Sequence, residues 1–144
     1  MLSFILLSAC DEDLVDQLQT ELTTVPNVTN GFKDGVYSTR GEPWAYGYET
    51  AEVTIENGQI VNIELRRFDK EGNEINYDEW VGGDAPGSYP NLKQARIDLE
   101  NEIINNQSTE GVDSIAGATI TTGNWIALVK EALEMAMPNH NNQE

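Results

Sequence analysis

Apolar residues between positions 32 and 68 alternate with polar ones, which is the period of strands that bury one face. The alternating apolar positions lie in two successive stretches and comprise Ala51, Val53, Ile55, Val61, Ile63 and Leu65. Asn57-Gly58 separates the two stretches and is a two-residue hairpin signal. An earlier strand is expected to open at residues 33–37 and to break at 41–43. The pattern therefore predicts an antiparallel β-meander.

Further along the chain the apolar spacing changes to three and four residues, the period of a helix packed on one face. In residues 91–105 the apolar stripe comprises Leu92, Ala95, Leu99 and Ile103. A second stripe follows Thr122-Gly123 and comprises Ile126, Val129, Leu133 and Met137, after which Pro138 stops the helix. The predicted fold class is α+β, an antiparallel β-meander packed against two amphipathic helices.

The segment between the strands and the first helix, residues 68–89, is rich in Gly, Asp, Asn and Glu and predicts an irregular surface excursion. Its acidic run from Asp69 to Glu74 loosely resembles a Ca²⁺ loop, but the full ligand spacing is missing, which favours a solvated loop. Trp80 and Tyr89 either line a ligand or cap the core, and capping is the commoner role for single aromatic residues.

Composition narrows the possible chemistry. The 144 residues carry a formal net charge of -17, which opposes nucleic acid and anionic lipid as partners and favours a basic protein. A solvated acidic surface that serves solubility is the alternative.

With one Cys and one His, a single chain cannot build an iron–sulfur cluster, a Cys/His zinc site or a bis-His haem. His140 stands in a polar tail that is ill suited to catalysis. Redox chemistry would therefore need an organic cofactor.

Residues 1–9 are almost wholly apolar and end in Leu7-Ser8-Ala9-Cys10, which resembles a bacterial lipobox. This predicts a lipoprotein-type signal peptide at 1–9 and an acidic tether at 10–31, anchored through lipid on Cys10. The folded domain would span 32–138 and a polar tail 139–144. The expected location is the bacterial cell membrane, facing outside the cytoplasm. The alternative is a buried N-terminal strand or helix with an inert Cys10, which the acidic residues immediately after Cys10 disfavour.

One stretch, residues 113–122, joins an acid, a small-residue turn and several hydroxyls, and then runs into the second helix. Gly117 and Ala118 let the backbone turn tightly and leave the hydroxyl of Thr119 uncovered. The helix that follows offers free N–H groups to an anion. These features outline a phosphate site.

The same stretch resembles the flavinylation motif of the FMN-binding domain family, an Asp, two variable residues, Ser or Thr, then Gly-Ala-Thr. Asp113 and Gly117-Ala118-Thr119 match the motif, and Ala116 stands where the family usually has Ser or Thr. The opening Asp34-Gly35-Val36-Tyr37 and the hairpin on Asn57-Gly58 also resemble this family. So does the order of the two helices around the motif. The resemblance covers about residues 33–137. The chain is also similar in this way to the peripheral flavin subunits of sodium-pumping NADH:quinone reductase, which have domains of this family.

The resemblance implies an extracytoplasmic electron carrier with FMN bonded to Thr119 through a phosphoester. Electrons would pass from a membrane donor to an extracytoplasmic acceptor. No His, Lys or Cys lies next to Thr119 to activate its weakly acidic hydroxyl, so a separate flavin transferase using FAD is expected to load it. Asp113 would help that enzyme to recognise the loop or would brace it. Thr121 and Thr122 are expected either to bond the phosphate or, more in keeping with their residue type, to cap the helix.

Two alternatives stay open. Because Ala116 lacks the usual hydroxyl, the chain is also compatible with a lipid-anchored binding or structural module that has the same fold and no covalent flavin. A free-standing reductase would need a substrate pocket and a proton donor, and the sequence displays neither.

Overall fold

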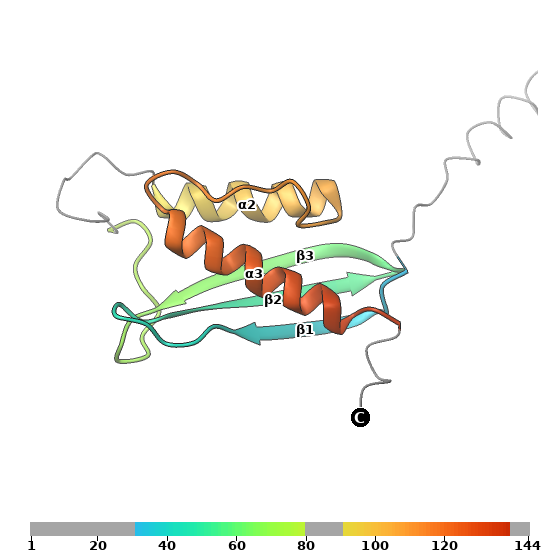
Figure 1. Ribbon diagram of the computed structural model, residues 1–144, viewed down its shortest axis with the longest axis horizontal. Helices are drawn as coiled ribbons and strands as arrows, with labels where there is room; N and C mark the ends of the chain where they lie inside the picture. Colours follow the sequence, from blue (N-terminus) through green and yellow to red (C-terminus); the bar gives the residue numbers. More distant parts are fainter. Residues whose placement is uncertain (1–30, 80–90, 139–144) are drawn as a thin grey trace, which may run out of the picture.

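The computed structural model describes residues 31–79 and 91–138, which form a three-stranded antiparallel sheet with two helices on one face (Figure 1). The strands β1 (Gly35–Arg40), β2 (Tyr48–Glu56) and β3 (Gln59–Phe68) follow one another in the sheet in sequence order. Helices α2 (Leu92–Asn106) and α3 (Thr119–Met135) cover the sheet, with α3 over β1 and β2 and α2 over β3. The predicted α+β fold class is therefore confirmed.

The hairpin between β2 and β3 turns where the sequence predicts it. Asn57 has φ = 53° and Gly58 has φ = 73°. Positive φ at both central residues is what a type I′ turn requires, and it matches the twist of the two strands. Ala51 lies opposite Leu65 and Val53 opposite Ile63, so the core faces of the two strands coincide.

A register shift between Thr54 and Ile55 corrects one predicted core position. Thr54 pairs with Asn62 but Ile55 pairs with Ile60, so Val61 is an extra residue on β3. Ile60 consequently faces the core at 2% exposure, whereas Val61 is 45% exposed. The expected alternation through Val61 is wrong because a bulge reverses the side-chain direction at this point.

Helix α2 begins and ends within one residue of the predicted range, and its buried face is the predicted stripe of Leu92, Ala95, Leu99 and Ile103. Asn91 caps its start by accepting the N–H groups of Lys93 and Gln94. Near its end, the side chain of Gln107 pairs with the backbone of Ile60 on the outer edge of β3, and both hydrogen bonds are 2.8 Å long. Gln107, the residue directly after the helix, thus pairs with part of the edge of β3.

Helix α3 starts earlier than its apolar stripe predicts. It begins at Thr119, so Gly123 lies inside the helix, and it ends before Met137, which is 44% exposed. The predicted residues Val129 and Leu133 are buried, but the largest side chain in the core is Trp125, which is fully buried and was not in the predicted stripe. The Nε1–H of Trp125 donates to the Arg66 carbonyl at 2.9 Å, so the buried indole has its polar partner.

None of the described helices is long and apolar enough to cross a membrane. The expected signal peptide, tether, lipidation site Cys10 and polar tail, together with Trp80, Tyr89 and His140, lie outside the described residues.

Candidate functional site

The residues before α3 form a tight turn that ends at the helix start. The carbonyl of Ile115 accepts the N–H of Ala118 at 3.0 Å, and Gly117 has φ = 85° at the third position of this turn. Positive φ at that position is typical of a type II turn and favours Gly. Ala116 occupies the second position with its side chain exposed, and Ala118 is buried.

The first turn of α3 is open to an anion. Its N-cap residue is Ala118, no side chain caps the helix, and no acidic residue lies in the first turn. The first N–H groups of a helix have no acceptor within it, and the helix dipole places partial positive charge at this end. A bound phosphate would meet donors and favourable charge here, with no carboxylate within that turn.

Thr119 is the first residue of this helix and is exposed. The only hydrogen bond of its hydroxyl among the described residues is donated to the carbonyl of Ile115, at the long distance of 3.5 Å. Asp113 is also exposed, at the start of the loop. The hydroxyl that the motif singles out is therefore accessible to another molecule.

Thr121 and Thr122, in contrast, are buried, and their hydroxyls bond to protein atoms. The Thr122 hydroxyl donates to the Ala118 carbonyl and accepts the Ile115 N–H, both at 2.9 Å, so it joins the two ends of the turn. The Thr121 hydroxyl accepts from Nη1 of Arg67 at 2.7 Å. The expected capping by these hydroxyls is not found, because both residues lie inside the helix after the N-cap.

A buried ion pair, which the sequence alone did not predict, lies beneath the start of α3. Glu49 of β2 is 1% exposed and Arg67 of β3 is 7% exposed, and Oε1 of Glu49 lies 3.9 Å from Nε of Arg67. Burial lowers the pKa of the Arg67 guanidinium and Glu49 opposes that shift, so Arg67 stays charged. The signal was present, since Glu49 and Arg67 each continue the inward-facing alternation of their strand by two residues.

Two further side chains complete this Glu49 cluster, which we define as Glu49, Arg67, Thr121, Trp44 and Asn124. The Oε2 atom of Glu49 accepts Nε1–H of Trp44 at 3.1 Å and the side-chain N–H of Asn124 at 2.9 Å. The cluster therefore ties both strands to the first two turns of α3 and to the connection between β1 and β2. Because a buried ion pair adds little net stability, its main effect here is to fix the orientation of the groups that it bonds.

A cavity of about 360 Å³ lies between the β1–β2 connection and α3. This Trp44 cavity is lined by Gly41, Glu42, Trp44, Ile120, Asn124, Ala127 and Leu128. Ile120, which directly follows Thr119 in the chain, is 60% exposed and forms part of this lining. Its lining is largely apolar and includes an indole, which suits a planar aromatic ligand.

The wall that carries Trp44 is held in place by a close backbone contact. Trp44 and Gly47 form two backbone hydrogen bonds, of 2.7 and 3.1 Å. Gly47 has φ = 125°, and a Cβ atom there would lie 1.8 Å from the Phe68 carbonyl oxygen. Only glycine fits this position, so the connection between β1 and β2 packs tightly on the end of β3.

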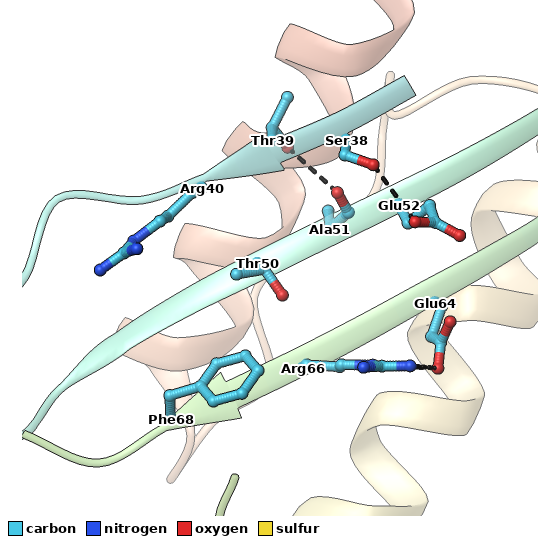
Figure 2. A pocket seen from close by; sticks show the side chains of 9 residues that line it. All are labelled: Ser38, Thr39, Arg40, Thr50, Ala51, Glu52, Glu64, Arg66 and Phe68. Atoms are coloured by element: carbon cyan, nitrogen blue, oxygen red, sulfur yellow. Dashed lines mark hydrogen bonds and ion pairs between the residues drawn. The ribbon is translucent and has the colours of Figure 1, made fainter. Parts of the chain in front are cut away.

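A second hollow, of about 350 Å³, lies on the three strands and is lined by none of the motif residues (Figure 2). Its polar side chains are largely paired with one another, Arg66 with Glu64 and Ser38 with Glu52. Arg40 lies 4.0 Å above the ring of Tyr48, which stacks on Phe68.

Farther along the chain, the Asp69 carboxylate accepts the backbone N–H of Asn73 and closes the acidic loop. No group of metal-ligating side chains is found in residues 31–79 and 91–138.

Comparison with known proteins gives one family match. Residues 46–134 match the model of the FMN-binding domain. The crystal structure of a Clostridium perfringens protein is 23% identical with a TM-score of 0.56, over 73% of this chain and 88% of that one, and supports the fold alone. A solution structure from Clostridium thermocellum is 20% identical with a TM-score of 0.46, over 78% of this chain and 99% of that one. No curated protein matches the sequence.

Proposed function

This chain belongs to the FMN-binding domain family, and on that premise we propose that it is an electron-transfer protein that carries FMN through a phosphoester bond to Thr119. The observation that carries the proposal is the position of this hydroxyl. It is exposed on the first residue of a helix without a side-chain cap, directly after the turn that Ile115 and Ala118 close.

The site fits the phosphate end of FMN. A phosphodiester keeps one negative charge, which the free N–H groups and the positive end of the α3 dipole stabilise. Thr122 holds the turn that presents Thr119, because its hydroxyl bonds both Ile115 and Ala118. In this proposal Thr122 positions the attachment site through the protein backbone.

The site also fits the ring end. The Trp44 cavity begins at Ile120, one residue after the attachment point, and offers an indole and aliphatic side chains to a planar ring. Bound FMN supplies the electron-accepting and electron-donating chemistry, which the chain's own residues lack. The residues of the cavity would bind the ring, limit its contact with water and set its orientation.

Attachment needs a second protein. The Thr119 oxygen forms a bond to the FMN phosphorus of FAD, the bond from that phosphorus to the AMP moiety breaks, and AMP leaves. A base must take the hydroxyl proton, and no described His, Lys or Cys lies beside Thr119. We assign this step to a flavin transferase, with the exposed Asp113 as part of the surface that the transferase recognises.

The proposed setting rests on the N-terminal sequence. Lipid on Cys10 would hold the protein at the outer side of the bacterial cell membrane, where it passes electrons from a membrane donor to an extracytoplasmic acceptor. With 25 Asp and Glu against eight Lys and Arg, the chain has a net charge of -17, which disfavours a nucleic acid partner and suits a basic protein partner.

One observation favours a second candidate, a lipid-anchored module of the same fold without covalent flavin. Ala116 replaces the hydroxyl residue that the family usually has at this point of the motif. The Ala116 side chain is exposed in the turn, so the turn forms without a hydroxyl at this position. In this second candidate, the missing hydroxyl weakens recognition of the loop by the transferase.

Intact mass after co-expression with a flavin transferase tests the proposal. The wild-type protein should gain the mass of one FMN residue, and Thr119→Ala should gain none. Thr109→Ala is the matched control, because the side chain of Thr109 makes no hydrogen bond among the described residues. Unmodified wild-type protein would favour the second candidate, and an FMN adduct on Thr119→Ala would place the bond elsewhere. Ala116→Ser tests whether restoring the hydroxyl increases loading.

A further inference from the structure

The Trp44 cavity contains one polar side chain on its helical wall, Asn124. Asn124 lies one turn after Ile120 on α3, and the other helical residues that line the cavity are Ala127 and Leu128. A polar residue in a largely apolar lining is a candidate for ligand recognition, because a polar atom that is left unpaired there lowers stability unless a ligand or water pairs with it.

The orientation of the Asn124 amide follows from its partner. Its side-chain nitrogen donates to Oε2 of Glu49 at 2.9 Å. The carboxylate of Glu49, paired with Arg67, can only accept hydrogen bonds, so the amide must turn its NH₂ group toward it. The side-chain oxygen therefore faces away from Glu49, and no described residue donates a hydrogen bond to it.

The other polar groups of the cavity favour the same kind of ligand. The only donor of the Trp44 side chain, Nε1–H, is also bonded to Glu49, at 3.1 Å. Glu42 is exposed and adds a second acceptor to the lining. Apart from the second N–H of the Asn124 amide, the side chains of the cavity thus offer acceptors, which favour a ligand edge that presents an N–H group.

We infer that the side-chain oxygen of Asn124 accepts a hydrogen bond from N3–H of a flavin ring in the Trp44 cavity, an inference that rests on the proposed function. The oxidised isoalloxazine ring carries a single N–H, at N3, so an acceptor in the cavity can be used only by that group. Glu49 is a positioning residue, because its carboxylate holds the Asn124 amide in the required orientation.

Free ring compounds test this inference without the covalent bond. Lumiflavin has the isoalloxazine ring with a methyl group in place of the ribityl phosphate, and 3-methyllumiflavin lacks the N–H. Each is titrated into the apoprotein while the side-chain amide signal of Asn124 is followed by NMR. One neutral hydrogen bond corresponds to about a two- to tenfold preference for lumiflavin.

Variants separate the hydrogen bond from steric effects of the added methyl group. Asn124→Ala removes the acceptor and leaves room for the methyl, so it should bind both compounds equally. Gly123→Ala is the matched control on the same helix, since a Cβ at Gly123 meets nothing within 4 Å, and it should keep the wild-type preference. If Asn124→Ala does not fold, Asn124→Ser takes its place, because its shorter side chain also removes the amide oxygen and leaves room for the methyl group.

Equal binding of the two compounds by the wild-type protein, or no binding of lumiflavin up to its solubility, would overturn the inference. So would a preference that persists in Asn124→Ala. The mass of the transferase-treated protein reports separately on Thr119. A loaded protein without the preference refutes only the role of Asn124, and a preference without loading refutes only the covalent bond.

Discussion

Replacing Thr122 by Val tests how the turn before the attachment site is held. The two side chains have nearly the same shape, so the change removes the hydroxyl with little change of volume at this fully buried position. The hydroxyl makes two hydrogen bonds, to the Ala118 carbonyl and from the Ile115 N–H. The expected effect is a loosened turn at the start of α3.

The two bonds contribute unequally. The Ala118 carbonyl also accepts the backbone N–H of Thr122 at 2.9 Å, so it stays paired in the variant. The half-buried Ile115 N–H loses its acceptor, which costs about 1–2 kcal/mol of unfolding free energy. For a domain of this size that loss corresponds to a decrease in Tm of very roughly 4–15 °C.

Urea denaturation measures the change in unfolding free energy, and amide hydrogen exchange measures the protection of Ile115. Thr122→Val should lower both. Thr50→Val is the matched control, because the Thr50 hydroxyl has no hydrogen-bond partner among the described residues and Val suits a strand. If Thr122→Val keeps wild-type stability and Ile115 stays protected, the Thr122 hydroxyl does not hold the turn.

Three further outcomes are expected. Gly123→Ala should raise the unfolding free energy by about 0.5–1 kcal/mol in thermal or urea denaturation, because Gly is unfavourable inside a helix and the new methyl meets no atom within 4 Å; a destabilised variant would contradict the helix geometry. Burial raises the pKa of Tyr77 to about 12, so the neutral phenol favours folding below pH 10 and that contribution is lost as the pH rises toward 12. Tyr77→Phe should therefore lose less stability than wild type over that interval, and equal losses would refute the assignment. Cys10→Ala should move the protein from the membrane fraction to the soluble fraction, and retention that resists high salt would exclude the lipid anchor.

Local sequence determined the elements that depend on neighbouring residues. The Asn57-Gly58 turn, the alternation in β2 and the buried stripe of α2 all follow from steric preferences and side-chain periods within a few residues. The turn at Gly117 is local in the same sense, since it needs positive φ at one residue. For these reasons the sequence alone predicted the fold class and the location of the motif.

Tertiary structure decided the features that depend on residues far apart in the chain. The bulge that exposes Val61 is a property of strand pairing, and the single-strand pattern does not contain it. Glu49 and Arg67 are distant in sequence, yet strand register brings them together beneath α3. The amide of Asn124 takes its orientation from that pair, because a buried carboxylate accepts hydrogen bonds and cannot donate them. Which atom of Asn124 a ligand meets is thus a consequence of packing between two strands and a helix, and no local pattern encodes it.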